Sequence, residues 1–509
     1  MTVIAPVSRG KQRGLALLFL LILIGLAGAF FLVNTMNKSG AALSLARDQK
    51  TQAALDLAKQ ALLTFVATTY AERAMDIVST PYPPPGYAHD PNKGVPGYFP
   101  CPDSPSSLAE GYAAGTCGSS SVSTIGKFPW YTLDIEPLRD GSGECLWYAV
   151  SGTYKFSPNG VTTNTSTSNM MNWDTPGLFD VLAADGSTFL AGNSPSARAV
   201  AVIFAPGPPL PGQDRSNAGG ANCRGNYTAS NYLETASGVN NSAVSAVANA
   251  VTQFIAGQAS NTFNDRLVYI TREEVWTAIK KLPDSSGIYP SLLQAKLNTL
   301  TQKVAQCIAQ YGTQNGTPSL DPNDKRLPWT TVMSLSNYAV DSQYADNAGT
   351  KSGHVSYNVS NSKTATNNSI NPPSLFAATS YCKVSGTMND SDINWYSNWK
   401  DHLFYALSNR FRPDTGSPTL PCDPGSCVKV NGSLTLNAAV VMFTGERLAG
   451  QMRDSDSDRA NITNYLEGRN ASNHPNSGYG DYQSGAPSAT FNDLLYCISQ
   501  DLLSVAPCP

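Results

Sequence analysis

The chain is short of charge and of the residues that most enzymes use for chemistry. Charged residues make up 14 % of its 509 residues, against roughly 25 % in an average soluble domain. It has four histidines, and neither a G-x-S-x-G nor an H-E-x-x-H pattern occurs. A net charge of −3 gives no basic footprint for nucleic acid. These shortages lead us to expect a protein that binds and assembles rather than an enzyme.

Serine, threonine, asparagine and glycine are abundant instead, in runs such as residues 162–169. Ten cysteines all follow residue 100, and no C-x-x-C pair is present. Metal binding is the alternative use of cysteine, but the spacing favours disulfides in an oxidising compartment. The two local pairs that we expect to be disulfides are Cys422–Cys427 and Cys497–Cys508.

An uncharged apolar run, Leu15–Val33, is long enough to cross a bilayer as a helix. Arg9, Lys11 and Arg13 precede it, and the next charge is Lys38. The positive-inside rule then predicts a cytoplasmic N-terminus and an exported remainder. A secretory signal peptide is the competing interpretation, although its apolar core is usually shorter.

The apolar run leads directly into a segment that favours helix. No proline occurs from Leu15 to Val78, and alanine and leucine predominate. Pro81 and the prolines at 83–85 then end any helix. We therefore expect one transmembrane and stem helix over residues 15–80.

A short basic leader that ends in Gly14, followed by this apolar stem, resembles the type IV pilin and type II secretion pseudopilin family. The resemblance covers residues 9–80. It implies prepilin-peptidase cleavage between Gly14 and Leu15, methylation of the new N-terminus, and packing against other pilin or pseudopilin subunits. It also implies an inner-membrane precursor whose head lies in the periplasm or on a cell-surface filament.

The chain departs from this family at one place. Most members carry glutamate at the fifth mature position, where this chain has Phe19. A buried carboxylate needs a charge partner, so its absence favours a minor, tip-like subunit of a pilus or secretion filament. The alternative is a single-pass, membrane-anchored envelope protein with an exported binding or adhesive domain and no filament.

The exported part contains an internal duplication. Six segments recur in the same order, among them NYLE at 231–234 and 464–467. The matched ranges are 53–74 with 290–311, 128–130 with 327–329, 145–151 with 402–408, 199–215 with 438–453, 231–234 with 464–467, and 263–270 with 491–498.

Two tandem copies predict an α+β protein with two pilin-like heads, each a helix followed by an antiparallel sheet. The expected organisation is a leader at 1–14, the helix at 15–80, a first β-rich head at 81–285 and a second repeat at 286–509, whose helix spans about 290–312. The apolar runs 199–205 and 438–443 are typical of buried strands.

Three polar residues recur at matched places: Arg215 and Arg453, Glu234 and Glu467, Asp265 and Asp493. They are either two copies of a ligand site or groups that hold irregular loops through backbone hydrogen bonds. We favour the second interpretation because a duplicated module keeps what its fold requires.

Asp454, Asp456 and Asp458 alternate with serine and form the one candidate metal site. Carboxylate oxygens are the ligands that calcium prefers, but Arg459 and Tyr465 stand where an EF-hand needs glycine and glutamate. Tip pseudopilins bind calcium, so the resemblance implies calcium here. A solvated acidic loop is the alternative. We expect no other cofactor.

Overall fold

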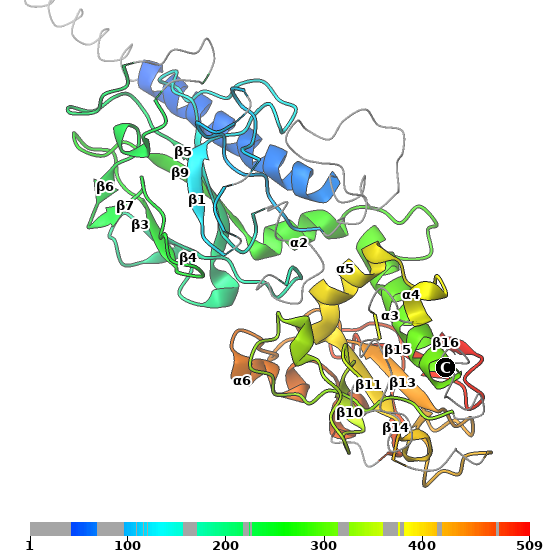
Figure 1. Cartoon of the computed structure of the whole chain (residues 1–509). Coiled ribbons are helices and arrows are strands. Elements are labelled where there is room, and N and C mark those ends of the chain that lie inside the picture. The colour runs from blue at the N-terminus through cyan, green and yellow to red at the C-terminus, as the bar shows by residue number, and fades with distance from the viewer. Residues whose placement is uncertain are drawn as a thin grey trace, which may run out of the picture.

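The computed structural model shows an α+β protein whose described residues form two large sheets and two small two-stranded ones (Figure 1). The residues it describes are 42–68, 96–107, 109–115, 117–119, 121–155, 170–216, 223, 226–313, 325–359, 375–376, 381–414, 420–474 and 478–509. Gly14, the apolar run Leu15–Val33 and the ends of the predicted stem lie outside them. No helix within those described ranges is both long and apolar enough to span a membrane.

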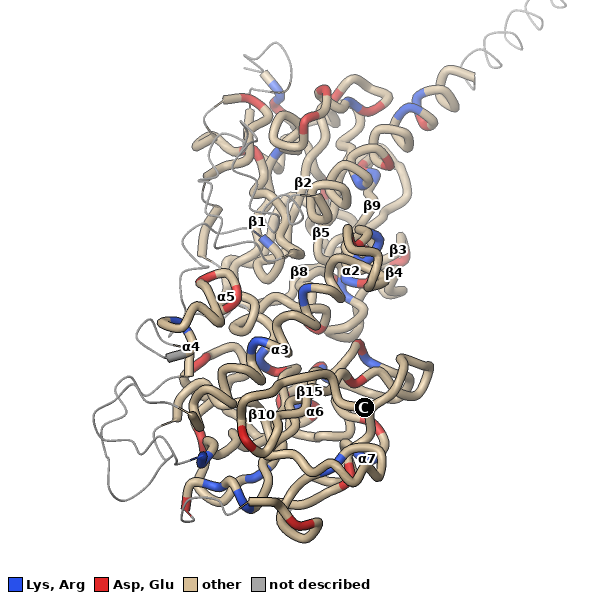
Figure 2. The backbone as a smooth tube through the Cα atoms, turned by 90° about the vertical axis from the view of Figure 1, so that its right-hand side faces the viewer, with Lys and Arg blue, Asp and Glu red and all other residues tan. Residues whose placement is uncertain are grey.

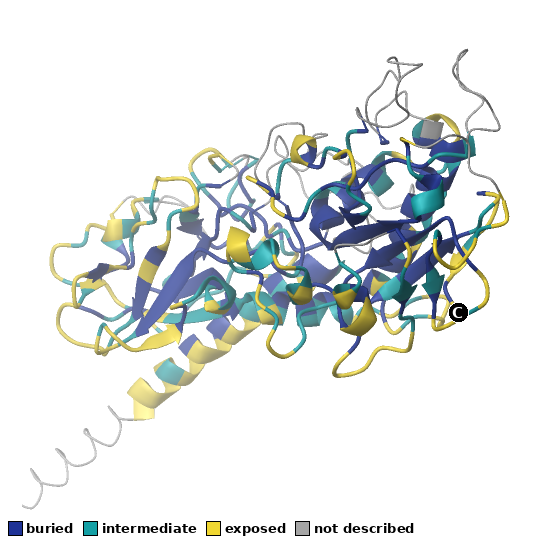
Figure 3. Ribbon diagram, turned by 90° about the horizontal axis from the view of Figure 1, so that it is seen from below, coloured by how far each residue is buried: buried dark blue, intermediate teal, exposed yellow. Residues whose placement is uncertain are grey.

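The N-terminal helix spans residues 42–68. Its buried side chains recur every three or four residues, as expected for a helix with one face on a sheet. They are Ala54, Leu55, Ala58, Leu62 and Val66. Residues 42–50, by contrast, are almost all exposed and run beyond the sheet (Figure 3).

The first sheet has seven strands and differs in part from the antiparallel sheet that we expected. Most of its pairs are antiparallel, but β3 and β8 run parallel. The reason is a long connection between β3 and β8, which lets the chain return in the same direction. The strands are β1 (Thr124–Lys127), β2 (Trp147–Val150), β3 (Phe179–Ala183), β4 (Phe189–Ala191), β5 (Ala199–Ala205), β8 (Thr252–Ala256) and β9 (Arg266–Thr271). A small hairpin adds β6 (Thr235–Ala236) and β7 (Val239–Asn240).

The second sheet is antiparallel throughout, in the order β10-β11-β13-β15-β16. Its strands are β10 (Ser352–His354), β11 (Leu403–Leu407), β13 (Ala439–Phe443), β15 (Leu494–Ile498) and β16 (Val505–Pro507), and β12 (Lys429–Val430) pairs separately with β14 (Asp481–Tyr482). The helix α3 (Leu292–Thr313) packs on β13, β15 and β16, close to the predicted bounds. The other helices are α2 (Arg272–Lys280), α4 (Tyr381–Val384), α5 (Asp390–Trp399), α6 (Asp456–Arg459) and α7 (Gly468–Ser472).

Central strands of both sheets are buried on two faces, which explains their continuous apolar sequences. In β13, Val441 packs in the cluster that includes α3, whereas Val440 and Met442 pack against Tyr465. In β5, Ile203 and Phe204 divide in the same way between two clusters. Each sheet therefore has a helix on one face and loops on the other.

Matched sequence segments occupy the same register in the two sheets. In the first sheet Phe204 lies between Trp147 and Leu267. In the second, Met442 lies between Phe404 and Leu495. The sequence alignment pairs Trp147 with Phe404 and Leu267 with Leu495. It pairs Phe204 with Met442 when the segments 199–215 and 438–453, which differ by one residue in length, are aligned at their C-terminal ends. We call residues 42–68 with 96–285 the first module, and residues 286–509 the second module.

The modules follow one another head to tail. The first residue of β3 pairs with the first residue of β5. Asp174, in the segment just before β3, contacts His402, the residue just before β11. The end of the first sheet at which β5 begins therefore abuts the end of the second sheet at which β11 begins. A single apolar cluster runs through both modules, from Ala54 to Leu502.

All ten cysteines form disulfides, and none is free. Both predicted pairs, Cys422–Cys427 and Cys497–Cys508, are among them. The other three are Cys101–Cys117, Cys145–Cys223 and Cys307–Cys382. Five disulfides are typical of an extracytoplasmic location.

Candidate functional site

Four side chains in each module form the same set of hydrogen bonds, which we call the polar frame. It comprises Gln213, Arg215, Glu234 and Asp265 in the first module and Gln451, Arg453, Glu467 and Asp493 in the second. The repeated Arg, Glu and Asp that the sequence singled out all belong to it.

In the second module, the side-chain amide of Gln451 donates to Glu467 at 2.8 Å. Arg453 donates to the backbone oxygens of Asn464, at 2.5 Å, and Gly445, at 3.2 Å. These bonds tie the loop after β13 to the segment before α7. Backbone groups that have no sheet partner there are satisfied by side chains.

In the first module, the equivalent residues make the equivalent bonds. Gln213 donates to Glu234 at 2.6 Å. Arg215 donates to the backbone oxygens of Asn231 and Gly207, both at 2.8 Å. The contacts of the repeated arginines are therefore those of the structural interpretation, in which they hold irregular loops in place.

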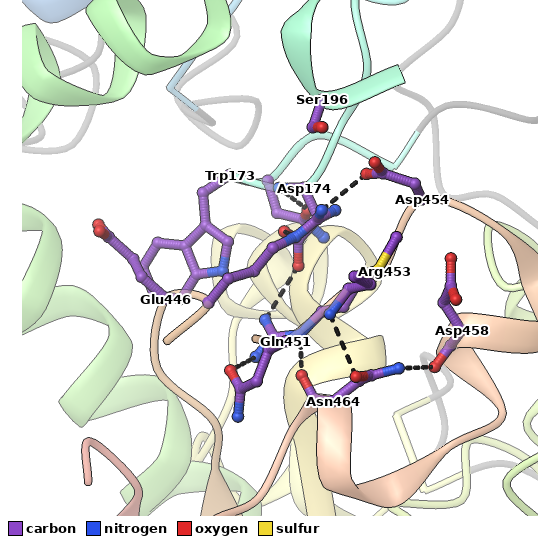
Figure 4. A network of polar contacts seen from close by, with 12 residues as sticks. Trp173, Asp174, Ser196, Glu446, Gln451, Arg453, Asp454, Asp458 and Asn464 are labelled. Atoms are coloured by element: carbon purple, nitrogen blue, oxygen red, sulfur yellow. Dashed lines mark hydrogen bonds and ion pairs between the residues drawn. The ribbon is translucent and has the colours of Figure 1, made fainter. Parts of the chain in front are cut away.

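The modules differ in what lies against the frame arginine. In the second module it is Asp174, a buried carboxylate of the first module (Figure 4). Asp174 lies 3.0 Å from Arg453, 2.5 Å from Arg447 and 3.0 Å from His402. One acidic side chain thus joins three basic groups of the other module.

The loop that carries Asp174, residues 170–175, is the inserted loop. The backbone N–H of Met171 donates to the side chain of Asn398 at 2.7 Å. The side-chain amide of Asn172 donates to the Asn398 backbone oxygen at 2.9 Å and to Asp401 at 3.0 Å. Two consecutive residues of the loop are therefore fixed to the second module by three hydrogen bonds.

Aromatic rings surround this contact. Four of the seven tryptophans of the chain meet at it: Trp173, Trp276, Trp395 and Trp399. The ring centroids of Trp173 and Trp399 are 4.5 Å apart in an edge-to-face arrangement, which is favourable beyond the apolar area that it buries. Their packing removes water from around the ion pairs.

His402 lies between two carboxylates. Its Nδ1 is 2.8 Å from Asp401, and its Nε2 is 3.0 Å from Asp174. The indole N–H of Trp173 also points to Nε2, at 2.7 Å. Because an indole N–H can only donate, the neutral ring with its proton on Nδ1 satisfies Trp173 and Asp401. Protonation of Nε2 exchanges the Trp173 bond for one to Asp174.

The charges at the junction shift the pKa of Asp174. Burial by itself raises that pKa, but Arg453, His402 and Arg447 outweigh burial and hold the pKa well below its ordinary value. Asp174 is therefore ionised at neutral pH and stays ionised to lower pH than a free aspartate. Removing it would leave cations in a site from which water is excluded.

The three candidate calcium ligands are not brought together. Asp454 forms an ion pair with Arg447 at 2.6 Å. Asp458 accepts the backbone N–H of Ser455 at 3.0 Å as part of a capping box at the start of α6, and Asp456 is exposed. Across the described residues, no three His, Cys, Asp or Glu side chains are arranged to hold a metal.

The junction is closed to substrates. Asp174 is 3 % exposed, and His402 and Arg453 are fully buried. A substrate could not reach these groups without separating the modules, so this arrangement of acid, imidazole and guanidinium serves to join them. Elsewhere, positive and negative residues are interspersed along both modules (Figure 2).

Sequence reasoning missed Trp173 and Asp174 because they occur in the first copy alone. A search for repeats passes over a segment that has no match. The sequence holds no clear signal for this contact, since Trp173 and Trp276 are far apart in the chain and only Trp395 and Trp399 are close neighbours. No family model, curated protein or solved structure matches the chain.

Proposed function

We propose that the chain is a minor pilin or pseudopilin-like subunit of a bacterial type IV pilus or type II secretion filament, placed at or near the tip. Its N-terminal segment anchors the precursor in the inner membrane and, after processing at Gly14, packs with other subunits. Its two modules form the exported head, which acts in assembly, adhesion or substrate contact.

The observation that carries the proposal is the N-terminal helix. Residues 42–50 are almost all exposed, with Leu43 and Leu45 at 63 % and 58 %, and Asp48 forms an ion pair with Arg266 at the start of β9. In the sequence this portion continues, without a proline, from the apolar run Leu15–Val33. A helix that is exposed over its first turns and packed on a sheet over the rest is suited to bundle with neighbouring stems.

Two further features support a terminal position. The joined modules make a head that is large for a repeating shaft subunit. Phe19 replaces the glutamate that the family uses to stack one subunit beneath another. The same substitution is also compatible with an anchored envelope protein that forms no filament, which remains the second candidate.

Mass spectrometry of the mature N-terminus tests the processing step. We expect a chain that begins at Leu15 and carries a methyl group on its amine. Gly14→Val should leave the full-length precursor, and Gly10→Val, in the same leader, should be processed normally. An intact Met1 in the wild type, or cleavage beyond Val33, would rule out the pilin proposal.

Site-specific photo-crosslinking separates the filament from the simple anchor. A photoreactive residue at Leu45 should form adducts with other pilin-like subunits. The same residue at Leu434, which is 99 % exposed in the second module, should not, because it lies far from the stem. A protein without a filament would give subunit adducts at neither position.

A further inference from the structure

Each module buries a pair of carboxyl groups inside its polar frame. In the first module they belong to Glu234 and Asp265, which are 8 % and 3 % exposed. In the second they belong to Glu467 and Asp493, which are 8 % and 4 % exposed. Two ionised carboxylates cannot share such a site without a large electrostatic cost.

The hydrogen bonds of the second pair identify three of its four oxygens as acceptors. Oε1 of Glu467 accepts from Gln451 at 2.8 Å, and Oε2 accepts from the backbone N–H of Asn492 at 3.0 Å. Oδ2 of Asp493 accepts from the Glu467 backbone at 3.1 Å and from Asn470 at 2.9 Å. Oδ1 of Asp493 is buried and receives no donor.

The first pair repeats this pattern. Oε1 of Glu234 accepts from Gln213 at 2.6 Å, and Oε2 accepts from the backbone N–H of Asn264 at 2.9 Å. Oδ2 of Asp265 accepts from the Glu234 backbone at 2.9 Å and from Asn241 at 3.1 Å. Oδ1 of Asp265 is again the buried oxygen without a donor.

An oxygen that is buried and receives no hydrogen bond is expensive unless it is itself a donor. The two residues of each pair are adjacent, because the glutamate backbone N–H donates to the aspartate carboxyl group and, in the first module, the Asp265 backbone N–H donates to Glu234 at 3.2 Å. A proton on one carboxyl group of such a pair removes the repulsion between two buried negative charges. Oδ1 of the aspartate is the one oxygen of the pair that accepts no N–H, so a proton can reside there without displacing a hydrogen-bond donor.

We propose that each module binds one proton in this pair, held on Oδ1 of Asp265 and of Asp493 and donated to the adjacent glutamate, and that it keeps this proton at neutral pH. The chain thus has two equivalent proton-binding sites. They do not depend on the filament proposal.

The surroundings agree with a neutral aspartic acid. Burial first, and then the neighbouring glutamate, raise the pKa of Asp265 and of Asp493 well above the ordinary value. The charged groups on flanking elements are each paired elsewhere, in the ion pairs Arg215–Glu144, Arg266–Asp48, Arg453–Asp174, Arg469–Asp481 and Glu446–Lys280.

Folding therefore takes up protons. The unfolded chain releases them near pH 4, where free aspartate titrates, whereas the folded chain holds them to higher pH. Stability from these sites is complete below that unfolded value and falls as pH rises towards the folded value. Each site changes the folding equilibrium constant about tenfold per pH unit in this window.

Infrared spectroscopy of the full-length protein in detergent tests the proposal directly. At pH 7 the wild type should show the carbonyl band of protonated carboxylic acid, with an amplitude of two groups per chain. Asp493→Asn should remove half of it, and the double variant Asp265→Asn, Asp493→Asn should remove it all. A wild-type spectrum without this band, or a band that the double variant retains, would refute the proposal.

The pH dependence of unfolding gives a second test with a matched control. Asp493→Asn keeps an acceptor at Oδ2 and supplies N–H donors to Glu467, so it should fold and should halve the proton uptake. Glu467→Gln places an amide N–H against one of the two donors, the Gln451 side chain or the Asn492 backbone N–H, so it should be less stable at every pH. If Asp493→Asn leaves proton uptake unchanged, the proton does not reside on this pair.

Discussion

Arg215 and Arg453 occupy the same place in two copies of one polar frame, yet they form ion pairs with different partners. Arg215 meets Glu144 of its own module at 3.3 Å, whereas Arg453 meets Asp174 of the other module at 3.0 Å. The frame itself is unchanged between the copies. The comparison teaches that loop support is what this fold requires, and that the face beside the arginine is free to diverge.

The modules also differ at the position of His402. Cys145 stands where the second module has His402, and it is bonded to Cys223. The first module therefore closes this face with its own disulfide-bonded loop. The second module leaves the face open to the inserted loop, with His402 available to contact Asp174.

The largest effect that we expect comes from removing the partner of Arg453. Asp174→Ala should destabilise the protein by about 5 kcal/mol, at the top of the range for a broken buried pair, because it strands two arginines. The matched change Glu144→Ala in the first module should cost about 1 kcal/mol or less, since Glu144 is partly exposed. Denaturant unfolding measures both. Equal losses would show that the two arginines have equivalent surroundings in solution.

The same pair predicts a response to acid. The pKa of Asp174 is held well below its ordinary value, so its stabilisation is complete above about pH 4 and is lost as pH falls through the folded pKa. The carboxyl pairs of the polar frame act in the opposite direction. Stability measured against pH should therefore pass through a maximum. In Asp174→Asn, stability should fall less steeply as pH drops below that maximum. An unchanged acid side in that variant would contradict the assignment.

Removing Cys145–Cys223 tests how the first module closes. The bond joins residues 78 apart in sequence, so the chain-entropy model gives a loss of about 4.5 kcal/mol for the double serine variant. Cys422–Cys427, with a separation of 5, should cost about 2 kcal/mol by the same model. Thermal unfolding of the two variants compares them. A reversed order would show that strain or residual structure outweighs loop entropy.

The smallest expected difference in stability is the one between two tryptophan substitutions. Trp173→Phe removes the N–H that donates to His402 and should cost about 1–2 kcal/mol more than the lost ring volume alone. Trp147→Phe removes an N–H that makes no hydrogen bond, and it introduces the residue type that the second module has at Phe404. We expect Trp147→Phe to be the milder change in denaturant unfolding. A larger loss for Trp147 would contradict this ranking.

Much of the fold could be predicted because the duplication supplies a comparison within one sequence. Matched apolar runs fixed which strands correspond, and the local spacing of Cys422 and Cys427 was enough to pair them. The parallel pairing of β3 with β8 could not be predicted, because it lies in a part of the first copy that has no counterpart. The inserted loop was missed for the same physical reason: burial of Asp174 is created by contact with the other module.

The head-to-tail junction also has a mechanical consequence. The modules are connected both by the covalent segment 281–291 between α2 and α3 and by non-covalent contacts, among them the ion pairs of the inserted loop with Arg447 and Arg453. A chain with the covalent segment alone would bend at a hinge. When the covalent segment and the ion pairs are both present, tilting one module against the other stretches buried ion pairs. A force applied to the far end of the second module is therefore transmitted to the N-terminal helix.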